Sequence, residues 1–381
     1  MSSATTMVGS GLDGVVAADT ELSEVDGTHG RLLVRGHWLE SLVEHSDFEG
    51  VCHLLLYGDL PSAGEKAALR ERLGAARARA FQRLPHLGAA LHAADGMDAL
   101  RGAVAQLQSI GKDREDAIGL IGALPVFAAA WHRYRDASAP IAPDALAGPA
   151  ADYLRMLTGA APNAAAARAL DTYWCTVAEH GMNASTFAAR VVASTGSDTV
   201  SAVAAALGAL KGPLHGGAPG PVLDMLGRIG TPENAHDFLA AELAAGRRIM
   251  GMGHRVYRVR DPRAAMLEGA ILRLSSDVGS ELGRKLALAR AVEQEAASLL
   301  AAKRPERALK ANVEFFTAVL LDAVGIPREL FSATFAAARV VGWCAHVEEQ
   351  RRTGRLIRPQ SRYVGKRPVE RDARGPVPHG S

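Results

Sequence analysis

The chain has 381 residues, of which 48% are hydrophobic and 22% are charged, and its formal net charge is +2. This length allows two or three domains at roughly 100–200 residues each, and the composition excludes a disordered chain, which would combine few hydrophobic residues with high net charge. A charge so close to zero gives no general reason to expect a polyanionic partner such as nucleic acid.

Cysteine usage and the absence of targeting patterns predict a cytoplasmic protein. Cys52, Cys175 and Cys344 are widely spaced and form no C-x-x-C pair, which argues against a disulfide framework and a zinc finger. Residues 1–27 contain acids but no Lys or Arg, unlike a signal or transit peptide. The longest mostly apolar stretch, 118–131, is too short to cross a bilayer at about 20 residues, so no membrane segment is expected.

Helices are predicted along most of the chain after a short N-terminal region. Residues 14–37 mix β-branched residues, glycines and charges, which predicts short strands or loops. From Leu39 onward the apolar residues have helical spacing, and Ser62 follows Pro61 at the start of a further helix. More helices are expected at 98–109, 115–134, 144–158, 165–180, 184–195, 199–210, 220–228, 235–245, 262–276, 281–302, 313–324 and 328–350.

No strand-helix alternation of the kind that builds a parallel sheet is present, so the predicted fold class is all-α. The tail, 351–381, is rich in Arg, Pro and Gly and loses helical periodicity. It is expected to wrap a surface or to be partly disordered.

Several catalytic motifs are missing. Gly251-Met252-Gly253 resembles the start of a G-x-G-x-x-G fingerprint, but Val256 stands at the position of the third glycine. The sequence contains no P-loop, no H-E-x-x-H and no G-x-S-x-G. Metal-dependent, phosphate-loop and serine-hydrolase chemistry are therefore disfavoured.

The remaining candidates are polar residues at helix ends. His215 lies in a glycine-rich turn, where a ligand can approach the backbone closely, and a helix N-terminus there would favour a neutral ring that donates to a carbonyl oxygen. His254 precedes Asp261-Pro262-Arg263, a helix start that would point Arg263 toward the same cleft. By residue type alone, these could equally be ordinary turn and capping residues.

A second set lies near the C-terminal end. Asn312 is a plausible N-cap with Glu314 in the first turn, where an acid usually only matches the helix dipole. Phe335 and Arg339 are four residues apart and share a helix face. A guanidinium beside an aromatic ring on an apolar helix suggests a bound carboxylate or an internal ion pair.

Four segments, taken together, resemble the citrate synthase family. They are Glu179-His180-Gly181-Met182-Asn183-Ala184-Ser185-Thr186-Phe187, Gly212-Pro213-Leu214-His215-Gly216-Gly217-Ala218, Gly253-His254-Arg255-Val256-Tyr257 with Asp261-Pro262-Arg263, and Asn312-Val313-Glu314-Phe315. Each motif alone is modest evidence, but four in this order with family-like spacing are very specific. The resemblance covers nearly the whole chain, from near Gly11 to Gly365.

The resemblance implies an α-helical homodimer with two domains in each subunit. Residues 1–213 and 321–381 would form the large domain, and 214–320 a smaller helical domain that closes over the active-site cleft. The implied reaction condenses acetyl-CoA with oxaloacetate and water to give citrate and CoA, at the entry of the tricarboxylic acid cycle. The CoA thioester is then a substrate, and no metal or other cofactor is expected.

Residue roles follow from the matched motif positions. By resemblance, His215 hydrogen-bonds the thioester carbonyl and stabilises the enol, His254 polarises the oxaloacetate carbonyl, and Glu314 stands where the family usually has the aspartate that removes the methyl proton. The implied substrate-binding residues are His180, Arg263, Arg339, Asn183, Phe335 and Arg358, the last reaching in from the other subunit.

Two departures from the family pattern leave alternatives open. Glu314 is one methylene longer than aspartate, and a positioning error of about 1 Å can cost on the order of 10²-fold in rate, so a citrate-synthase-like protein with impaired condensation is one alternative. Gly181 stands where many relatives have an acid. A 2-methylcitrate synthase using propionyl-CoA would share all these residues, because one methyl group changes binding by only about 1–3 kcal/mol.

Nucleic-acid binding through the basic tail is disfavoured. Glu370 and Asp372 dilute its positive charge, and Tyr363 is the tail's only aromatic residue for base stacking.

Overall fold

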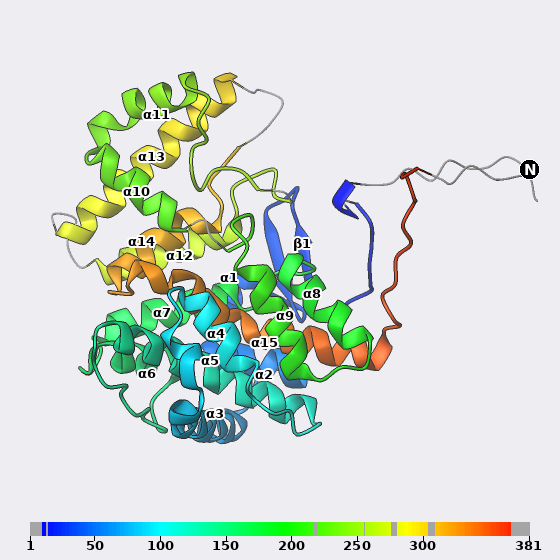
Figure 1. Ribbon diagram of the computed structural model, residues 1–381. Helices are drawn as coiled ribbons and strands as arrows, with labels where there is room; N and C mark the ends of the chain where they lie inside the picture. Colours follow the sequence, from blue (N-terminus) through cyan, green and yellow to red (C-terminus); the bar gives the residue numbers. More distant parts are fainter. Residues whose placement is uncertain are drawn as a thin grey trace, which may run out of the picture.

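A computed structural model describes residues 10–12, 14–216, 219–254, 256–275, 280–303 and 309–366 of the chain. It confirms the predicted all-α fold, with a small N-terminal sheet as the exception (Figure 1). The α-helices are α1 (Leu39–His45), α2 (Phe48–Tyr57), α3 (Ala63–Arg83), α4 (Gly96–Val104), α5 (Asp113–Arg135), α6 (Pro149–Thr158), α7 (Ala164–Val177), α8 (Ala184–Ser194), α9 (Thr199–Leu210), α10 (Pro219–Ile229), α11 (Ala235–Ala244), α12 (Pro262–Leu274), α13 (Glu281–Lys303), α14 (Val313–Ala323) and α15 (Phe331–Thr353). Short 3₁₀ helices are η1 (Ser10–Leu12), η2 (Leu84–His86), η3 (Gly88–His92), η4 (Pro232–Asn234) and η5 (Arg328–Leu330).

The N-terminal region forms an antiparallel sheet in the order β1-β2-β3. Strand β1 (Ser23–Asp26) pairs with β2 (Arg31–Val34), which pairs with β3 (His37–Trp38). The tip of the β1–β2 hairpin lies against a distant loop, because the carbonyl oxygen of Gly27 accepts a 2.8 Å hydrogen bond from the backbone N–H of Arg258. The sheet therefore connects the start of the chain to the segment that follows His254.

Two predicted helices are shorter than expected because side chains bind the adjoining backbone. Helix α6 begins at Pro149 rather than at 144, since Asp152 accepts a hydrogen bond from the backbone of Asp144 and Arg77 donates to two carbonyl oxygens of the loop. Helix α4 ends at Val104 rather than near 109, and Asp116 then accepts from the backbone of Ile110. A helix from 144 would have used the two carbonyl oxygens that Arg77 binds instead, and the carboxylates of Asp152 and Asp116 hold the adjoining loop backbone.

Helix α15 is the centre of the fold. It packs against α5, α7, α8 and α9, and its alanines permit close approach of these neighbours. The segment Arg328–Thr353 is long and apolar enough to cross a membrane by length and composition, yet 89% of its most apolar window is buried inside the protein. It is thus a core helix, and the C-terminal tail follows directly from its end.

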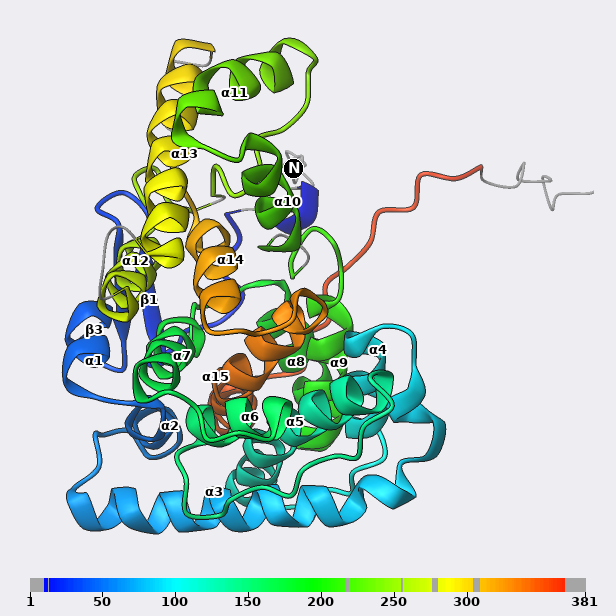
Figure 2. The same cartoon turned by 90° about the vertical axis from the view of Figure 1, so that its left-hand side faces the viewer.

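Helices α10, α11 and α13 form a group at one end of the molecule, with α12 and α14 between this group and α7 (Figures 1 and 2). All five helices lie within the predicted smaller domain, 214–320, except for the last turn of α14. That this region moves as a separate domain stays a prediction. The tail is helical to Thr353, and residues 354–366 then leave the body as an extended segment (Figure 2).

Candidate active site

Backbone hydrogen bonds bring the His254 loop to the start of α14. Asn312 donates from its backbone to the Gly251 carbonyl at 3.0 Å and from its side chain to the Gly253 carbonyl at 2.9 Å. Its side-chain oxygen accepts from the backbone of Glu314 at 3.0 Å, as expected of an N-cap. Gly253 has φ +88°, a conformation that favours glycine. These contacts place two of the predicted catalytic residues at one locus although they are 60 positions apart.

His254 is held as a neutral ring. Its Nδ1 accepts from the backbone N–H groups of Val256 at 3.0 Å and Tyr257 at 3.1 Å, so the ring proton belongs on Nε2. Burial lowers the pKa of His254 to about 4, and the charge of Arg263, whose Nη2 lies 3.4 Å from Nε2, acts in the same direction. The ring can therefore donate to a carbonyl oxygen at neutral pH without first losing a proton.

Arg263 is oriented by a bidentate pair with Asp261. Its Nε and Nη2 donate to the two carboxylate oxygens at 3.0 and 2.7 Å, and both side chains are buried. Asp261 also caps α12 and accepts from the backbone of Val313 at 3.2 Å. The same carboxylate thus fixes the arginine and the starts of two helices that border the site.

His215 belongs to a hydrogen-bonded chain with Ser185. Its Nε2 lies 2.8 Å from the Ser185 hydroxyl, which accepts from the Trp343 indole N–H at 3.1 Å. Burial, followed by the charge of Arg339, lowers the pKa of His215 to about 4. Ser185 lies within the recognised motif, but nothing in the sequence assigned it a role; its hydroxyl orients a predicted catalytic ring.

Glu314 carries a carboxylate without a hydrogen-bond partner among the described residues. Burial raises its pKa to about 7, an effect that the charges of Arg263 and Arg339 oppose and that of Asp261 reinforces. About half of these carboxylates are then ionised at neutral pH, which suits a general base. The residue is partly exposed, and its carboxylate forms no ion pair within the part of the chain that the structure describes.

Arg339 lies deep in the site with an unsatisfied donor. Its guanidinium stands 4.5 Å from the ring centroid of Phe335, and its Nε donates to the Val177 carbonyl at 2.5 Å. Its Nη2 is buried and has no hydrogen-bond partner among the residues that the structure describes. Burial lowers the pKa of Arg339 to about 10, so it stays charged. A buried, charged, unpaired donor is a group that a ligand carboxylate would satisfy.

His180 lies beside His254 at the same site. The two ring centroids are 5.6 Å apart at an angle of 81°, and the Nε2 of His180 is 3.1 Å from the Tyr257 hydroxyl. Burial, then the charges of Arg263 and Arg339, hold the pKa of His180 well below its usual range. The charges of Arg263 and Arg339 thus act on both His180 and Glu314, which links the neutral histidines and the carboxylate through the same two arginines.

Two predicted site residues lie outside this cluster. Asn183 is the N-cap of α8: its Oδ1 accepts from the Thr186 backbone and from Ser185, and its amide N–H donates to the Gly181 carbonyl. Its contacts make it a support for Ser185. Arg358 is exposed in the extended tail, and among the described residues no contact joins it to the cluster.

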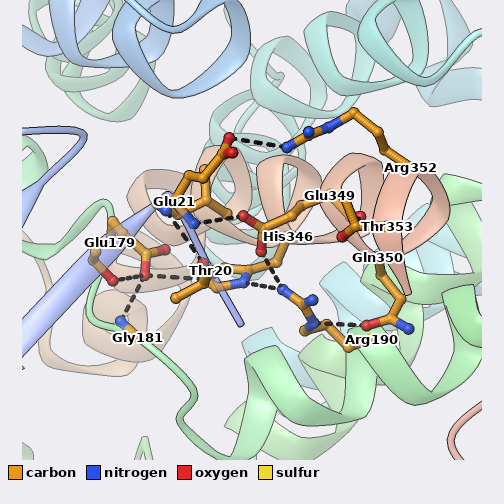
Figure 3. A network of polar contacts seen from close by, with 12 residues as sticks. Thr20, Glu21, Glu179, Gly181, Arg190, His346, Glu349, Gln350, Arg352 and Thr353 are labelled. Carbon is orange, nitrogen blue, oxygen red and sulfur yellow. Dashed lines mark hydrogen bonds and ion pairs between the residues drawn. The ribbon is translucent and has the colours of Figure 1, made fainter. Parts of the chain in front are cut away.

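A buried polar network beside the site was missed from the sequence (Figure 3). His346 lies between Glu179, 3.0 Å from its Nε2, and Arg190, 2.9 Å from its Nδ1. Arg190 pairs with Glu349 at 2.6 Å, and Glu349 accepts from the backbone of Glu21 at 2.8 Å. The sequence feature that could have indicated this network is the presence of His346 and Glu349 on a mostly apolar helix. Among the described residues, no group of three His, Cys, Asp or Glu side chains could hold a metal ion.

Comparison with known proteins identifies the family. The sequence model of the citrate synthase C-terminal domain matches residues 11–360. The chain belongs to the citrate synthase family. It is accordingly a condensing acyltransferase.

Curated citrate synthase relatives match along most of their length. The chain is 38% identical over 372 residues to putative citrate synthase 2 of Mycobacterium tuberculosis, covering 94% of this chain and 93% of the relative. It is 37% identical over 366 residues to citrate synthase of a Synechocystis species, with 93% and 90% covered. It is also 35% identical over 380 residues to 2-methylcitrate synthase of Shewanella oneidensis, with 97% and 98% covered.

Solved citrate synthase structures share the fold. That of Thermotoga maritima has a TM-score of 0.84 at 35% identity and covers 96% of this chain and 98% of its own. That of Thermoplasma acidophilum, solved as a ternary complex with carboxymethyl coenzyme A and oxaloacetate, has a TM-score of 0.83 at 29% identity, with 95% and 97% covered.

Proposed function

We propose that this chain is a citrate synthase that joins acetyl-CoA to oxaloacetate and hydrolyses the resulting citryl thioester. The observation that carries the proposal is the Glu314 carboxylate, which has no hydrogen-bond partner among the described residues and a pKa raised to about 7, at a site with neutral histidines and buried arginines. A base of this kind beside neutral donors is what removal of a proton next to a thioester carbonyl requires.

The first step forms the enolate of acetyl-CoA. Glu314 takes a proton from the methyl carbon, and the C–H electron pair moves toward the thioester oxygen, where His215 donates a hydrogen bond. For Nδ1 of His215 to carry the ring proton and donate it to the thioester oxygen, the Ser185 hydroxyl must turn its single proton from Asn183 Oδ1 to Nε2 of His215. Such a preorganised donor is worth roughly 10²–10³ in rate.

The second step forms the carbon–carbon bond. The enolate carbon attacks the ketone carbon of oxaloacetate, the Nε2–H of His254 stabilises the developing alkoxide by a hydrogen bond, and the alkoxide ends with the proton that Glu314 took from the methyl group. Arg263, Arg339 and His180 bind the dianion, with planar guanidiniums matched to carboxylates. Water then attacks the citryl thioester, the CoA thiol leaves, and citrate is released.

We infer a cytoplasmic homodimer in which Arg358 reaches the partner's site. The tail that carries Arg358 exposes apolar side chains, with Leu356, Tyr363 and Val364 at 57%, 66% and 83% exposure. Burying such side chains against a second subunit is favourable. In the cell the reaction would feed acetyl groups into the tricarboxylic acid cycle.

The test is oxaloacetate-dependent release of the CoA thiol, with the product identified by mass spectrometry. We expect citrate from acetyl-CoA, with kcat/KM above that for propionyl-CoA. A higher kcat/KM for propionyl-CoA would make the chain a 2-methylcitrate synthase. Folded protein that binds oxaloacetate but releases no thiol from either thioester would refute condensation.

A further inference from the structure

Tyr257 makes the direct contact between the two histidine-bearing segments on the oxaloacetate side of the site. Its side chain is buried, and its hydroxyl lies 3.1 Å from Nε2 of His180. Its ring centroid is 5.6 Å from that of His180 and 4.8 Å from that of His254. Tyr257 thus contacts both His180 and His254, which lie in different predicted domains.

The hydroxyl contact ties the tautomer of His180 to the position of the Tyr257 phenol proton. Burial raises the pKa of the Tyr257 phenol and lowers that of the imidazole, so both groups are neutral. A neutral phenol that donates to Nε2 leaves the ring proton on Nδ1. His180 then has a defined donor, and its ring cannot rotate without breaking a buried hydrogen bond.

The N-terminal hairpin holds the segment that carries Tyr257. The backbone N–H of Tyr257 donates to His254, and that of the next residue, Arg258, donates to the Gly27 carbonyl at 2.8 Å. Gly27 is pressed so closely against this segment that an added β-carbon would lie 2.3 Å from the carbonyl oxygen of Val256. A side chain at the hairpin tip would therefore displace the Tyr257 segment.

The same hairpin also supports the turn that carries His180. Ser23, at the start of β1, donates from its hydroxyl to the Glu179 carboxylate at 2.8 Å. The same Glu179 oxygen accepts from the backbone of Gly181 at 2.5 Å, which closes the turn around His180 (Figure 3). Strand β1 and the hairpin tip therefore contact both segments that Tyr257 joins.

We propose that Tyr257 is a positioning residue that orients His180 for binding the oxaloacetate dianion, and that the β1–β2 hairpin keeps Tyr257 in place. The ligand identity rests on the proposed function. The phenol acts through the histidine and not on the reacting carbon, so its loss weakens dicarboxylate binding far more than it affects the thioester.

The test compares Tyr257→Phe with Tyr153→Phe as a matched control. Tyr153 is also buried, and its hydroxyl contacts Thr334 at 3.0 Å, outside the site. For Tyr257→Phe we expect the Kd and KM for oxaloacetate to rise about tenfold, equivalent to roughly 1.4 kcal/mol, while the KM for acetyl-CoA changes less than about twofold. The control should leave all three constants within about twofold of wild type. In a His180→Ala background, Tyr257→Phe should add no further loss, because the coupled residues share one interaction.

A second pair of variants tests the hairpin. Gly27→Ala should raise the KM for oxaloacetate as Tyr257→Phe does, while Gly227→Ala, where a β-carbon meets nothing within 4 Å, should not. An unchanged Kd in Tyr257→Phe, or an equal loss in the His180→Ala background, would overturn the proposal. Calorimetric binding of oxaloacetate alone separates the two claims. If the wild-type protein binds oxaloacetate but does not condense it, the proposed function is refuted. The Kd values of wild type and Tyr257→Phe then still test the positioning role of Tyr257. A wild type that does not bind oxaloacetate overturns both.

Discussion

Glu314 gives the sharpest test of the chemistry, because its ionisation should set the pH dependence of the rate. With a pKa of about 7, the ionised fraction is about 10% at pH 6 and about 90% at pH 8, so kcat/KM for acetyl-CoA should rise nearly tenfold over that range. His215 and His254, with pKa values of about 4, stay neutral throughout. The rising limb should therefore belong to one group.

Replacing the carboxylate by its amide isolates that group. Glu314→Gln keeps the shape but cannot accept the proton, so we expect kcat to fall by about 10²–10⁴ and the dependence on pH to flatten. Glu314→Asp is the matched control: it keeps a carboxylate at the chain length usual in the family, and should keep the rising limb. Initial rates of thiol release from pH 5.5 to 8.5 at saturating oxaloacetate would measure both.

Two results would refute this reasoning. A wild-type rate that does not change between pH 6 and 8 would show that no base of pKa about 7 limits the reaction. A Glu314→Gln variant that retains more than about a tenth of the wild-type rate would show that another group removes the proton. Oxaloacetate binding by the variant, measured separately, shows that the site is intact.

Four further outcomes follow from contacts at and around the site. Ser185→Ala should lower kcat about tenfold or more with less effect on the KM for oxaloacetate, measured by steady-state kinetics, because the hydroxyl orients a histidine on the thioester side. Arg190→Met breaks a buried pair with Glu349 and should lower the free energy of unfolding by about 3–5 kcal/mol in denaturant titrations, whereas adding Glu349→Leu should recover part of the loss. Glu314→Gln should raise the Tm relative to wild type more at pH 8 than at pH 5: a folded-state pKa above the ordinary 4.5 gives stability that is complete below that value and lost as pH rises through 7. If Arg358 acts in the partner's site, mixing inactive Arg358→Ala and Glu314→Gln subunits should restore about a quarter of wild-type activity, since half of randomly formed dimers carry one intact site; no recovery in demonstrated mixed dimers would contradict it.

The sequence predicted the fold class, most helices and the central site because these depend on local or motif-level patterns. The capping box at Ser62 and Glu65 starts α3, and the N-cap at Asn312 starts α14, as their residue types indicate. His254 and Glu314 were expected at one site, and the Asn312 contacts to the Gly251–Gly253 backbone provide the connection. Here local propensity and tertiary structure agree.

Long-range polar partners were not predictable from the sequence. Glu179 and His346 are 167 positions apart, and Ser185 and Trp343 are 158 apart. A single Glu or Ser shows no periodicity that would indicate such a partner. The early end of α4 and the late start of α6 likewise depend on distant side chains, since Asp116 and Asp152 hold the loop backbone at Ile110 and Asp144.

Two groups of the site, on Arg339 and Glu314, lower the stability of the folded protein and in return are suited to bind substrate and to remove a proton. Among the described residues, Arg339 has a buried donor without a partner, and burial raises the pKa of Glu314 to about 7 while its carboxylate gains no hydrogen bond. Each departs from the rule that buried polar groups are paired. The surrounding structure tolerates them because α15, on which Arg339 lies, is fixed by close helix packing and by the Glu179–His346–Arg190–Glu349 network (Figure 3). A dianion that pairs with Arg339 removes the first of these costs, while Glu314 keeps its raised pKa for proton removal. Substrate binding energy and base strength therefore come from two different residues, both held by the helix packing around α15.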